Sequence, residues 1–133
     1  MLSTDCILRL DKIKNVDLFI SVMRLHTHND GKTPREDINF KKINIHLQLL
    51  SPSLKLLGDY YKRDLPWNDY EERFRAEINN NPRALYILKN LAREALTKNI
   101  VFLCIEEKPN FCHRKLLAQI CKEFQPNLEV IIK

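Results

Sequence analysis

The densest apolar run in the second half of the chain is Val-Phe-Leu-Cys-Ile, at residues 101–105. An unbroken run of this length is typical of a parallel strand whose two faces are both covered. Further along, apolar side chains recur at helical spacing, at Leu116, Leu117, Ile120, Cys121 and Phe124. This spacing predicts a helix that begins near Phe111, with Asn110 as its N-cap. The pattern therefore predicts a strand, a short polar turn and a helix in succession.

Three further segments have the composition of strands. Cys6 to Leu10 and Val16 to Val22 are the two early candidates, and Leu128 to Ile132 is the last. The second candidate is the stronger of the two early ones, because it is dense in residues that favour β-structure. The polar stretch from Leu25 to Glu36 is predicted to be a loop. Ile38 to Leu50 fits neither a strand nor a helix period throughout, and we expect a mixed segment there.

Three helices are predicted in the middle of the chain. One starts at Ser51-Pro52-Ser53 and runs to about Lys62, a second covers Asn68 to about Asn79, and a third runs from Pro82 to near Thr97. The resulting order favours an α/β protein with a mostly parallel or mixed sheet of about four strands flanked by helices. A chain of 133 residues fits one hydrophobic core, so we expect residues 1–133 to form a single domain.

Composition and charge narrow the function classes. Two glycines in the whole chain argue against a glycine-rich loop for nucleotide phosphates. Lysine and arginine number 22 against 17 acidic residues, for a formal net charge of +5, but the basic residues are scattered among the acids. This balance is compatible with RNA or DNA as a partner and does not require one.

The apolar runs and the cysteines bear on the environment of the protein. The longest apolar runs are far shorter than the roughly 20 residues needed to cross a bilayer, so we expect no membrane partner. The four cysteines stand at positions 6, 104, 112 and 121, without the paired spacing of zinc ribbons. Reduced thiols and a cytoplasmic location are therefore the expectation.

Chemically active side chains crowd the predicted strand-to-helix junction: Cys104, Glu106, Cys112, His113 and Arg114. Ligands of open α/β sheets bind at the carboxyl ends of the strands, and the first turn of a helix favours an anion or a thiolate. We therefore take Cys112 and His113 as candidate catalytic residues, a thiolate and an imidazole that acts as acid, base or phosphate donor. The alternative is that Cys112 is a core contact and His113 only caps the helix.

Arg24 closes the strongest early strand and belongs at the same edge of a parallel sheet. Together with Arg114 and His113 it suits phosphate or carboxylate. Arg24, Cys104, Glu106 and Arg114 are therefore the candidate ligand-binding residues, for an anionic small molecule or a phosphorylated ligand. A structural ion pair between Arg24 and Glu106 is the competing interpretation.

A metal site and a disulfide are two further interpretations of the residues at this junction. Cys104, Cys112 and His113 could supply three zinc ligands, with a fourth from His26, His28 or Glu106. Because the ligand spacing is unorthodox, the sequence favours no resident metal. Cys104 and Cys112 could instead form a disulfide or a resolving-thiol pair. No cofactor is identified from the sequence.

Three segments resemble one protein family. Leu103–Arg114, with its strand ending in cysteine and an acid, its turn and its Cys-His-Arg, resembles the signature of the family named domain of unknown function 488. Leu50–Leu57 with Trp67–Glu77, and Ile20–Arg24, resemble other parts of its small archaeal and bacterial members. The resemblance implies an α/β fold in which Arg24 faces Cys112, His113 and Arg114 across one cleft.

Two functions remain open on this evidence. The first is a small enzyme or anion-binding domain with a thiol-dependent site at the strand-to-helix junction. The second is a nucleic-acid or ribonucleoprotein-associated module without catalysis, in which the net positive charge does the binding.

Overall fold

The apolar run near residue 100 forms β4 (Ile100–Cys104), the central strand of the sheet in this computed structural model of residues 1–133. β4 pairs in parallel with β2 (Leu18–Ser21) on one side and with β1 (Leu2–Cys6) on the other. Two short strands, β3 (Ile45–His46) and β5 (Val130–Ile131), complete an all-parallel sheet in the order β3-β2-β4-β1-β5. All five residues of β4 are buried, as expected for an inner parallel strand.

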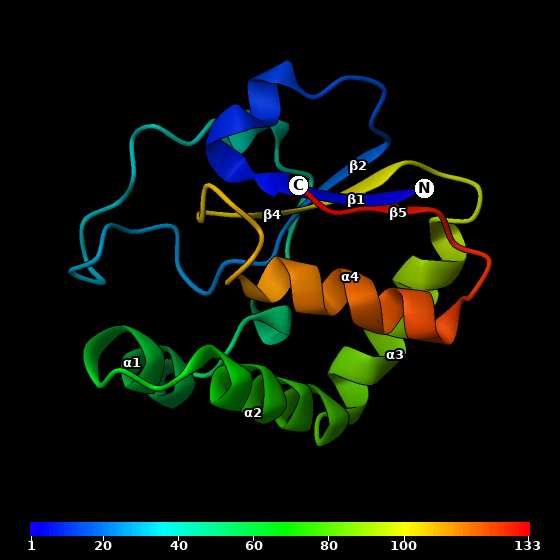
Figure 1. The fold of residues 1–133 in the computed structure, drawn as a ribbon. Coiled ribbons are helices and arrows are strands. Elements are labelled where there is room, and N and C mark those ends of the chain that lie inside the picture. The colour runs from blue at the N-terminus through cyan, green and yellow to red at the C-terminus, as the bar shows by residue number, and fades with distance from the viewer.

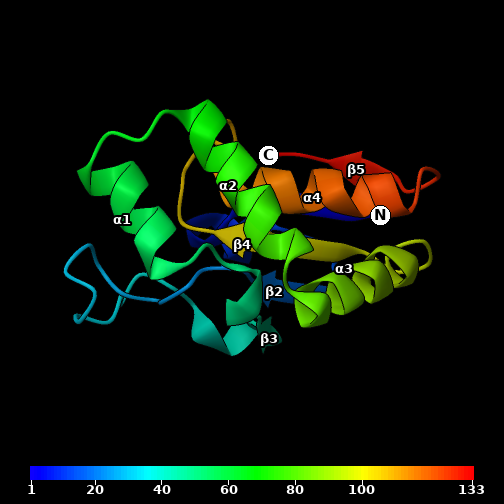
Figure 2. The same ribbon diagram turned by 90° about the horizontal axis from the view of Figure 1, so that it is seen from below.

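The α-helices lie on one side of this sheet and the first 3-10 helix lies on the other (Figure 1). The α-helices are α1 (Leu54–Lys62), α2 (Trp67–Asn79), α3 (Pro82–Glu94) and α4 (His113–Phe124). The 3-10 helices are η1 (Ile7–Lys12), η2 (Phe40–Lys42) and η3 (Gln48–Leu50). The view from below in Figure 2 shows α2, α3 and α4 spread over the sheet, with α1 beyond its edge.

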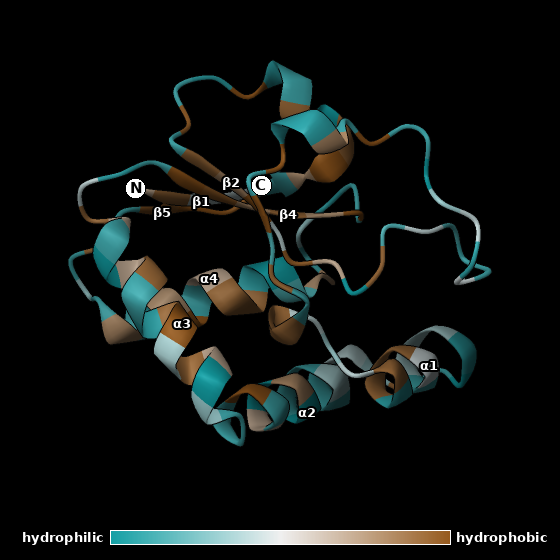
Figure 3. Cartoon of the chain, turned by 180° about the vertical axis from the view of Figure 1, so that it is seen from behind, coloured by the Kyte–Doolittle hydropathy of each residue, from teal (hydrophilic) through white to brown (hydrophobic).

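Burial follows the apolar pattern of the helices. The predicted apolar face of α4 is buried at Leu116, Leu117, Ile120 and Cys121, and Phe74 of α2 and Leu88 of α3 are also fully buried. In Figure 3 the strands are mostly brown, whereas teal and brown segments alternate along α2, α3 and α4, as expected for helices with one apolar face. No helix combines the length and the apolar character that crossing a membrane requires.

The carboxyl ends of the parallel strands meet at one edge of the sheet, on the left of Figure 1. The predicted loop after β2 lies at this edge and is irregular apart from one bridge between Thr27 and Pro34. α1 lies at the same edge, and α4 starts there. The topology therefore gathers the end of β2, the end of β4 and the start of α4.

Most of the predicted elements are confirmed, and the differences have local causes. The sheet has five strands instead of about four, and it is parallel throughout. The first strand candidate, Cys6 to Leu10, is wrong: the strand is Leu2–Cys6 and the chain then forms η1. An apolar pattern does not predict the strand Leu2–Cys6, because two of its buried residues, Thr4 and Asp5, are polar.

The start of the last helix also differs from the prediction. α4 begins at His113, and its N-cap is Cys112, with φ −133° and ψ 139°, instead of Asn110. The backbone N–H of Cys112 donates to the carbonyl of Pro109, so residues 109–112 form a turn before the helix. Cys112 and His113 therefore lie at the N-terminal end of α4, instead of deeper inside its first turn.

Replacing Asn81 tests the cap that starts α3. The Asn81 side-chain oxygen accepts from the backbone N–H of Ala84 at 3.2 Å. We expect Asn81→Ala to lower the free energy of unfolding by about 1 kcal/mol in urea titrations, because that N–H loses its partner. The adjacent exposed Asn80, whose side chain makes no hydrogen bond, supplies the control Asn80→Ala, with an expected change below about 0.5 kcal/mol. Equal losses in the two variants would contradict the assignment.

Candidate functional site

A cleft of about 740 Å³ opens at the carboxyl edge of the sheet. Its walls come from the loop after β2, from α1, from α2 through Tyr70, from the end of β4 and from the start of α4. Five of the six predicted site residues line it: Arg24, Cys104, Glu106, Cys112 and His113. Residues from distant parts of the sequence thus share one cleft, at the place where α/β proteins hold ligands.

Cys104, Cys112 and His113 form what we call the thiol–imidazole cluster. Cys104 is the last residue of β4, Cys112 is the N-cap of α4 and His113 is its first residue. One side-chain donor atom from each of the three lies within 4.8 Å of the others, and Cys104 Sγ is 3.9 Å from His113 Nδ1. Their exposed fractions are only 5, 2 and 5 %, so the cluster is a nearly buried part of the cleft lining.

The orientation of the His113 ring is set by a backbone carbonyl. His113 Nε2 lies 2.6 Å from the carbonyl oxygen of Val22, which follows β2. A carbonyl oxygen can only accept, so Nε2 carries a hydrogen, and Nδ1 is the ring nitrogen directed at Cys104 Sγ. The edge of the Phe74 ring, 5.6 Å away between centroids, packs against the imidazole. The imidazole is therefore held in a single tautomer and a fixed direction.

The two thiols of the cluster differ in acidity. A hydrogen bond from Cys112 lowers the pKa of Cys104, because it stabilises the Cys104 thiolate. Burial raises the pKa of Cys112 well above its ordinary value, and donation to Cys104 raises it further. The thiolate that the helix start predicts at Cys112 stays a prediction, and the directions of the two pKa shifts favour ionisation at Cys104 instead.

Arg24 and Glu106 line the open part of the cleft without pairing with each other. The Arg24 side chain makes no hydrogen bond or ion pair, and its carbonyl accepts from the amide of Gln48. The Glu106 carboxylate accepts from the hydroxyl of Tyr61 at 2.6 Å. The structural ion pair between Arg24 and Glu106 is thus absent, and the guanidinium is available to a ligand.

Arg114 is the one predicted site residue that does not line the cleft. Its side chain is fully buried and donates to the carbonyls of Glu106, Glu107 and Lys133 at 2.6, 3.4 and 3.1 Å. The expectation that Arg114 faces Arg24 across a ligand is therefore corrected. Its guanidinium fixes the loop that carries Glu106, because a buried charge needs hydrogen-bond partners on every side.

Several residues that support the site were not predicted from the sequence. Arg9 pairs with Asp5 at 2.8 Å and also donates to the carbonyl of Glu107, so a second arginine holds the loop after β4. Tyr61 orients Glu106. Asp5 and Arg9 are four residues apart, a spacing that favours an ion pair, but nothing in the sequence links either residue to Glu107.

The two histidines of the loop after β2 have different surroundings. His28 lines the cleft, whereas His26 lies outside it and its Nε2 is 2.6 Å from the hydroxyl oxygen of Ser21. Burial, followed by the nearby His46, lowers the pKa of His26 to about 4. His26 is therefore engaged with its own neighbours and does not join the thiol–imidazole cluster.

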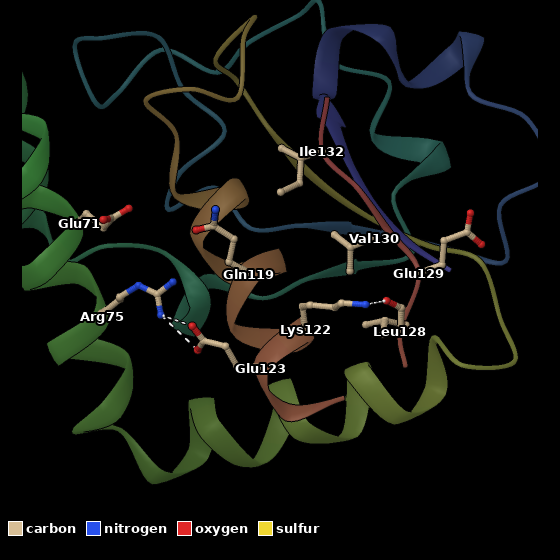
Figure 4. A pocket seen from close by; sticks show the side chains of 9 residues that line it. All are labelled: Glu71, Arg75, Gln119, Lys122, Glu123, Leu128, Glu129, Val130 and Ile132. Atoms are coloured by element: carbon tan, nitrogen blue, oxygen red, sulfur yellow. Dashed lines mark hydrogen bonds and ion pairs between the residues drawn. The ribbon is translucent and has the colours of Figure 1, made fainter. Parts of the chain in front are cut away.

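Another cavity lies on the far side of α4, away from the cluster (Figure 4). It is an open groove of about 840 Å³ between α2, α4 and the segment around β5. Three of its five charged side chains are engaged within the groove: Arg75 pairs with Glu123 at 3.1 Å, and Lys122 donates to the carbonyl of Leu128 at 2.6 Å. The groove contains no thiol or imidazole, so the cleft is the better candidate site.

Fold and site together define a class: a small α/β domain with a cysteine–histidine cluster at the carboxyl edge of a parallel sheet. Residues 15–125 match the family model DUF488-N3a, described as the active DUF488-N3 subclade, and the chain belongs to the family of domain of unknown function 488. No curated protein and no solved structure gives a significant match to it. The family resemblance seen in the sequence is thereby confirmed.

Replacing Arg114 by lysine tests its structural role. A lysine keeps the charge but lacks the planar fork that reaches three carbonyls, so at least one carbonyl loses its donor. We expect Arg114→Lys to lower the free energy of unfolding by roughly 2–4 kcal/mol in urea titrations. Arg93→Lys is the matched control, because Arg93 is exposed on α3 and makes no side-chain bond. A stability equal to that of the control would refute the role of Arg114.

A pair of Cys112 variants tests the acidity of Cys104. Cys112→Ala removes the donor to the Cys104 thiolate and should raise the pKa of Cys104, whereas Cys112→Ser keeps a donor and should raise it less. The measurement is the pH dependence of iodoacetamide modification at Cys104, followed by peptide mass spectrometry in the presence of a chelator and a reductant. Identical profiles for the alanine variant and the unaltered protein would contradict the hydrogen bond.

Proposed function

We propose that this domain binds an anionic small molecule, carrying phosphate or carboxylate, in the cleft and acts on it through the thiol–imidazole cluster. One observation carries the proposal: the unpaired guanidinium of Arg24 lines the same cleft as Cys104, Cys112 and His113. An arginine without a partner inside the chain is suited to bidentate recognition of such groups.

The cleft residues have distinct roles in this proposal. Arg24 binds the anionic group, and Glu106, oriented by Tyr61, accepts hydrogen bonds from polar groups of the ligand. Cys104 is the thiolate, Cys112 donates to it, and Nδ1 of His113 accepts a proton or a hydrogen bond from the reacting group. Arg24 and the three residues of the cluster line the same cleft, so a ligand held by Arg24 lies in the space that the cluster borders.

The charges of the cleft make Arg24 decisive for binding. Two basic residues, Arg24 and Lys62, and two acidic residues, Asp30 and Glu106, line the cleft. These charges balance, so the cleft has no broad positive field. Arg24 is the cation of the cleft that can form two parallel hydrogen bonds to an anion, and Lys62 offers only a point charge. Removal of this single side chain is therefore expected to abolish recognition.

The nucleic-acid-binding alternative lacks a specific observation in its favour. Seven basic side chains are paired with acidic ones, namely Arg9, Arg35, Lys42, Arg63, Arg73, Arg75 and Lys98. Such pairing reduces the positive charge available to phosphates of RNA or DNA. The alternative stays a prediction, to be tested by the salt dependence of RNA and DNA binding.

Thermal shift with inorganic phosphate and pyrophosphate tests the proposed function. We expect either anion to raise the Tm of the unaltered protein above that in chloride of equal ionic strength. A ligand at 100 times its Kd adds about 2.7 kcal/mol to the free energy of unfolding. Arg24→Gln should remove the shift, because it removes the only arginine that lines the cleft and hence its bidentate contact with the anion.

Arg93→Gln is the control for this experiment, since it makes the same change of charge at an exposed residue of α3. It should leave the anion-dependent shift unchanged. A shift of equal size in Arg24→Gln would place the anion elsewhere and sink the proposal, as would the lack of any shift in the unaltered protein.

A further inference from the structure

The thiol–imidazole cluster has the composition of a metal site. We propose that Cys104, Cys112 and His113 bind a zinc ion whose fourth coordination position opens to the cleft. This inference goes beyond anion binding, because it concerns a metal ion that the chain itself binds, and it does not involve Arg24. It also departs from the expectation of no metal that the spacing of the cysteines suggested.

The types of donor atom favour zinc over other divalent cations. Two cysteine sulfurs and one imidazole nitrogen are typical zinc ligands, whereas Mg²⁺ and Ca²⁺ require oxygen donors. No disulfide connects the cysteines, so both sulfurs are available. Zinc also needs no oxidation or reduction to bind, only the loss of the two thiol protons.

The distances are close to those of a zinc site. Bond lengths of about 2.3 Å to sulfur and 2.0 Å to nitrogen, at tetrahedral angles, place sulfur and nitrogen about 3.5 Å apart and the two sulfurs about 3.8 Å apart. Cys104 Sγ lies 3.9 Å from His113 Nδ1, and the donor atoms of all three residues lie within 4.8 Å of one another. Small side-chain adjustments would therefore bring the cluster to ligand geometry.

The surroundings of His113 match those of a metal-binding histidine. Ligating histidines nearly always donate their second ring N–H to a carboxylate or a backbone carbonyl, which fixes the tautomer and the direction of the ring. His113 makes this contact, from Nε2 to the Val22 carbonyl at 2.6 Å. Nδ1 is consequently the nitrogen directed at the sulfurs. This contact comes from outside the cluster, so it orients Nδ1 toward the sulfurs whether or not a metal is bound.

Three protein ligands and an open position are typical of catalytic zinc, whereas structural zinc has four protein ligands. No fourth histidine, cysteine or carboxylate belongs to the group within 4.8 Å. All three ligands line the cleft, so the remaining position faces a space that a water molecule or substrate oxygen can enter. A zinc ion there would supply a Lewis acid next to the region where Arg24 and Glu106 bind the ligand.

Cobalt substitution tests the site directly. The full chain is reduced, treated with a chelator, freed of chelator and titrated with Co²⁺ and then with Zn²⁺. We expect a thiolate-to-cobalt charge-transfer band and the intense visible bands of tetrahedral cobalt, saturating at one equivalent and removed by Zn²⁺. Folded, unaltered protein that gives no charge-transfer band overturns the inference, whatever the variants do.

Variants locate the ion. Cys112→Ser and His113→Ala should weaken zinc binding by more than the roughly 10–100-fold that the loss of an outer contact costs. Cys121→Ser is the matched control: Cys121 is also a buried cysteine of α4, but its thiol donates to the carbonyl of Leu88. Circular dichroism establishes that each variant is folded. Unchanged cobalt spectra in folded Cys112→Ser, or equal losses in Cys121→Ser, would contradict the assignment.

Arg24→Gln separates this inference from the proposed function. It should abolish the phosphate-dependent thermal shift and leave the cobalt spectrum intact. Anion binding without a cobalt band would disprove the zinc site alone, and a cobalt band without anion binding would disprove only the anion.

Discussion

The position of β4 between β1 and β2 is the constraint on which the site depends. Parallel pairing on both sides aligns the three strand ends at one edge, so Cys104 ends beside the segment that follows β2. The short turn after β4 then returns the chain to the same edge at Cys112 and His113. The cluster is thus a product of strand order, since its members come from two elements and contact a third.

Backbone carbonyls hold this arrangement together. His113 donates to the carbonyl of Val22, which follows β2. Arg114 donates to the carbonyl of Glu106 in the loop after β4 and to that of Lys133, which follows β5. Neighbouring residues of one motif therefore serve different purposes: the imidazole faces the cleft, and the guanidinium is consumed by the scaffold. A buried arginine of this kind is costly unless all its donors are satisfied, and here none of its polar atoms lacks a partner.

The same three side chains support the two proposals in different protonation states. Without metal, a hydrogen bond from Cys112 favours ionisation at Cys104 alone. With zinc, both sulfurs are thiolates and the pair no longer needs a shared proton. In each case, His113 presents Nδ1 and keeps its other nitrogen on Val22, so the geometry of the ring does not change between the two.

The sequence alone determined the fold class and most elements. It also pointed to six site residues, of which five line the cleft. These features are predictable because the pattern of apolar residues is a local property of the chain, and it is strong in β4 and in the helices. Tertiary structure alone decided the rest: the strand Leu2–Cys6, whose polar residues are buried, and the separation of Arg114 from His113. It also decided that the pKa of Cys104 is lowered while that of Cys112 is raised, and that three donors converge. Burial and the distance between elements depend on packing, which no spacing along the chain encodes.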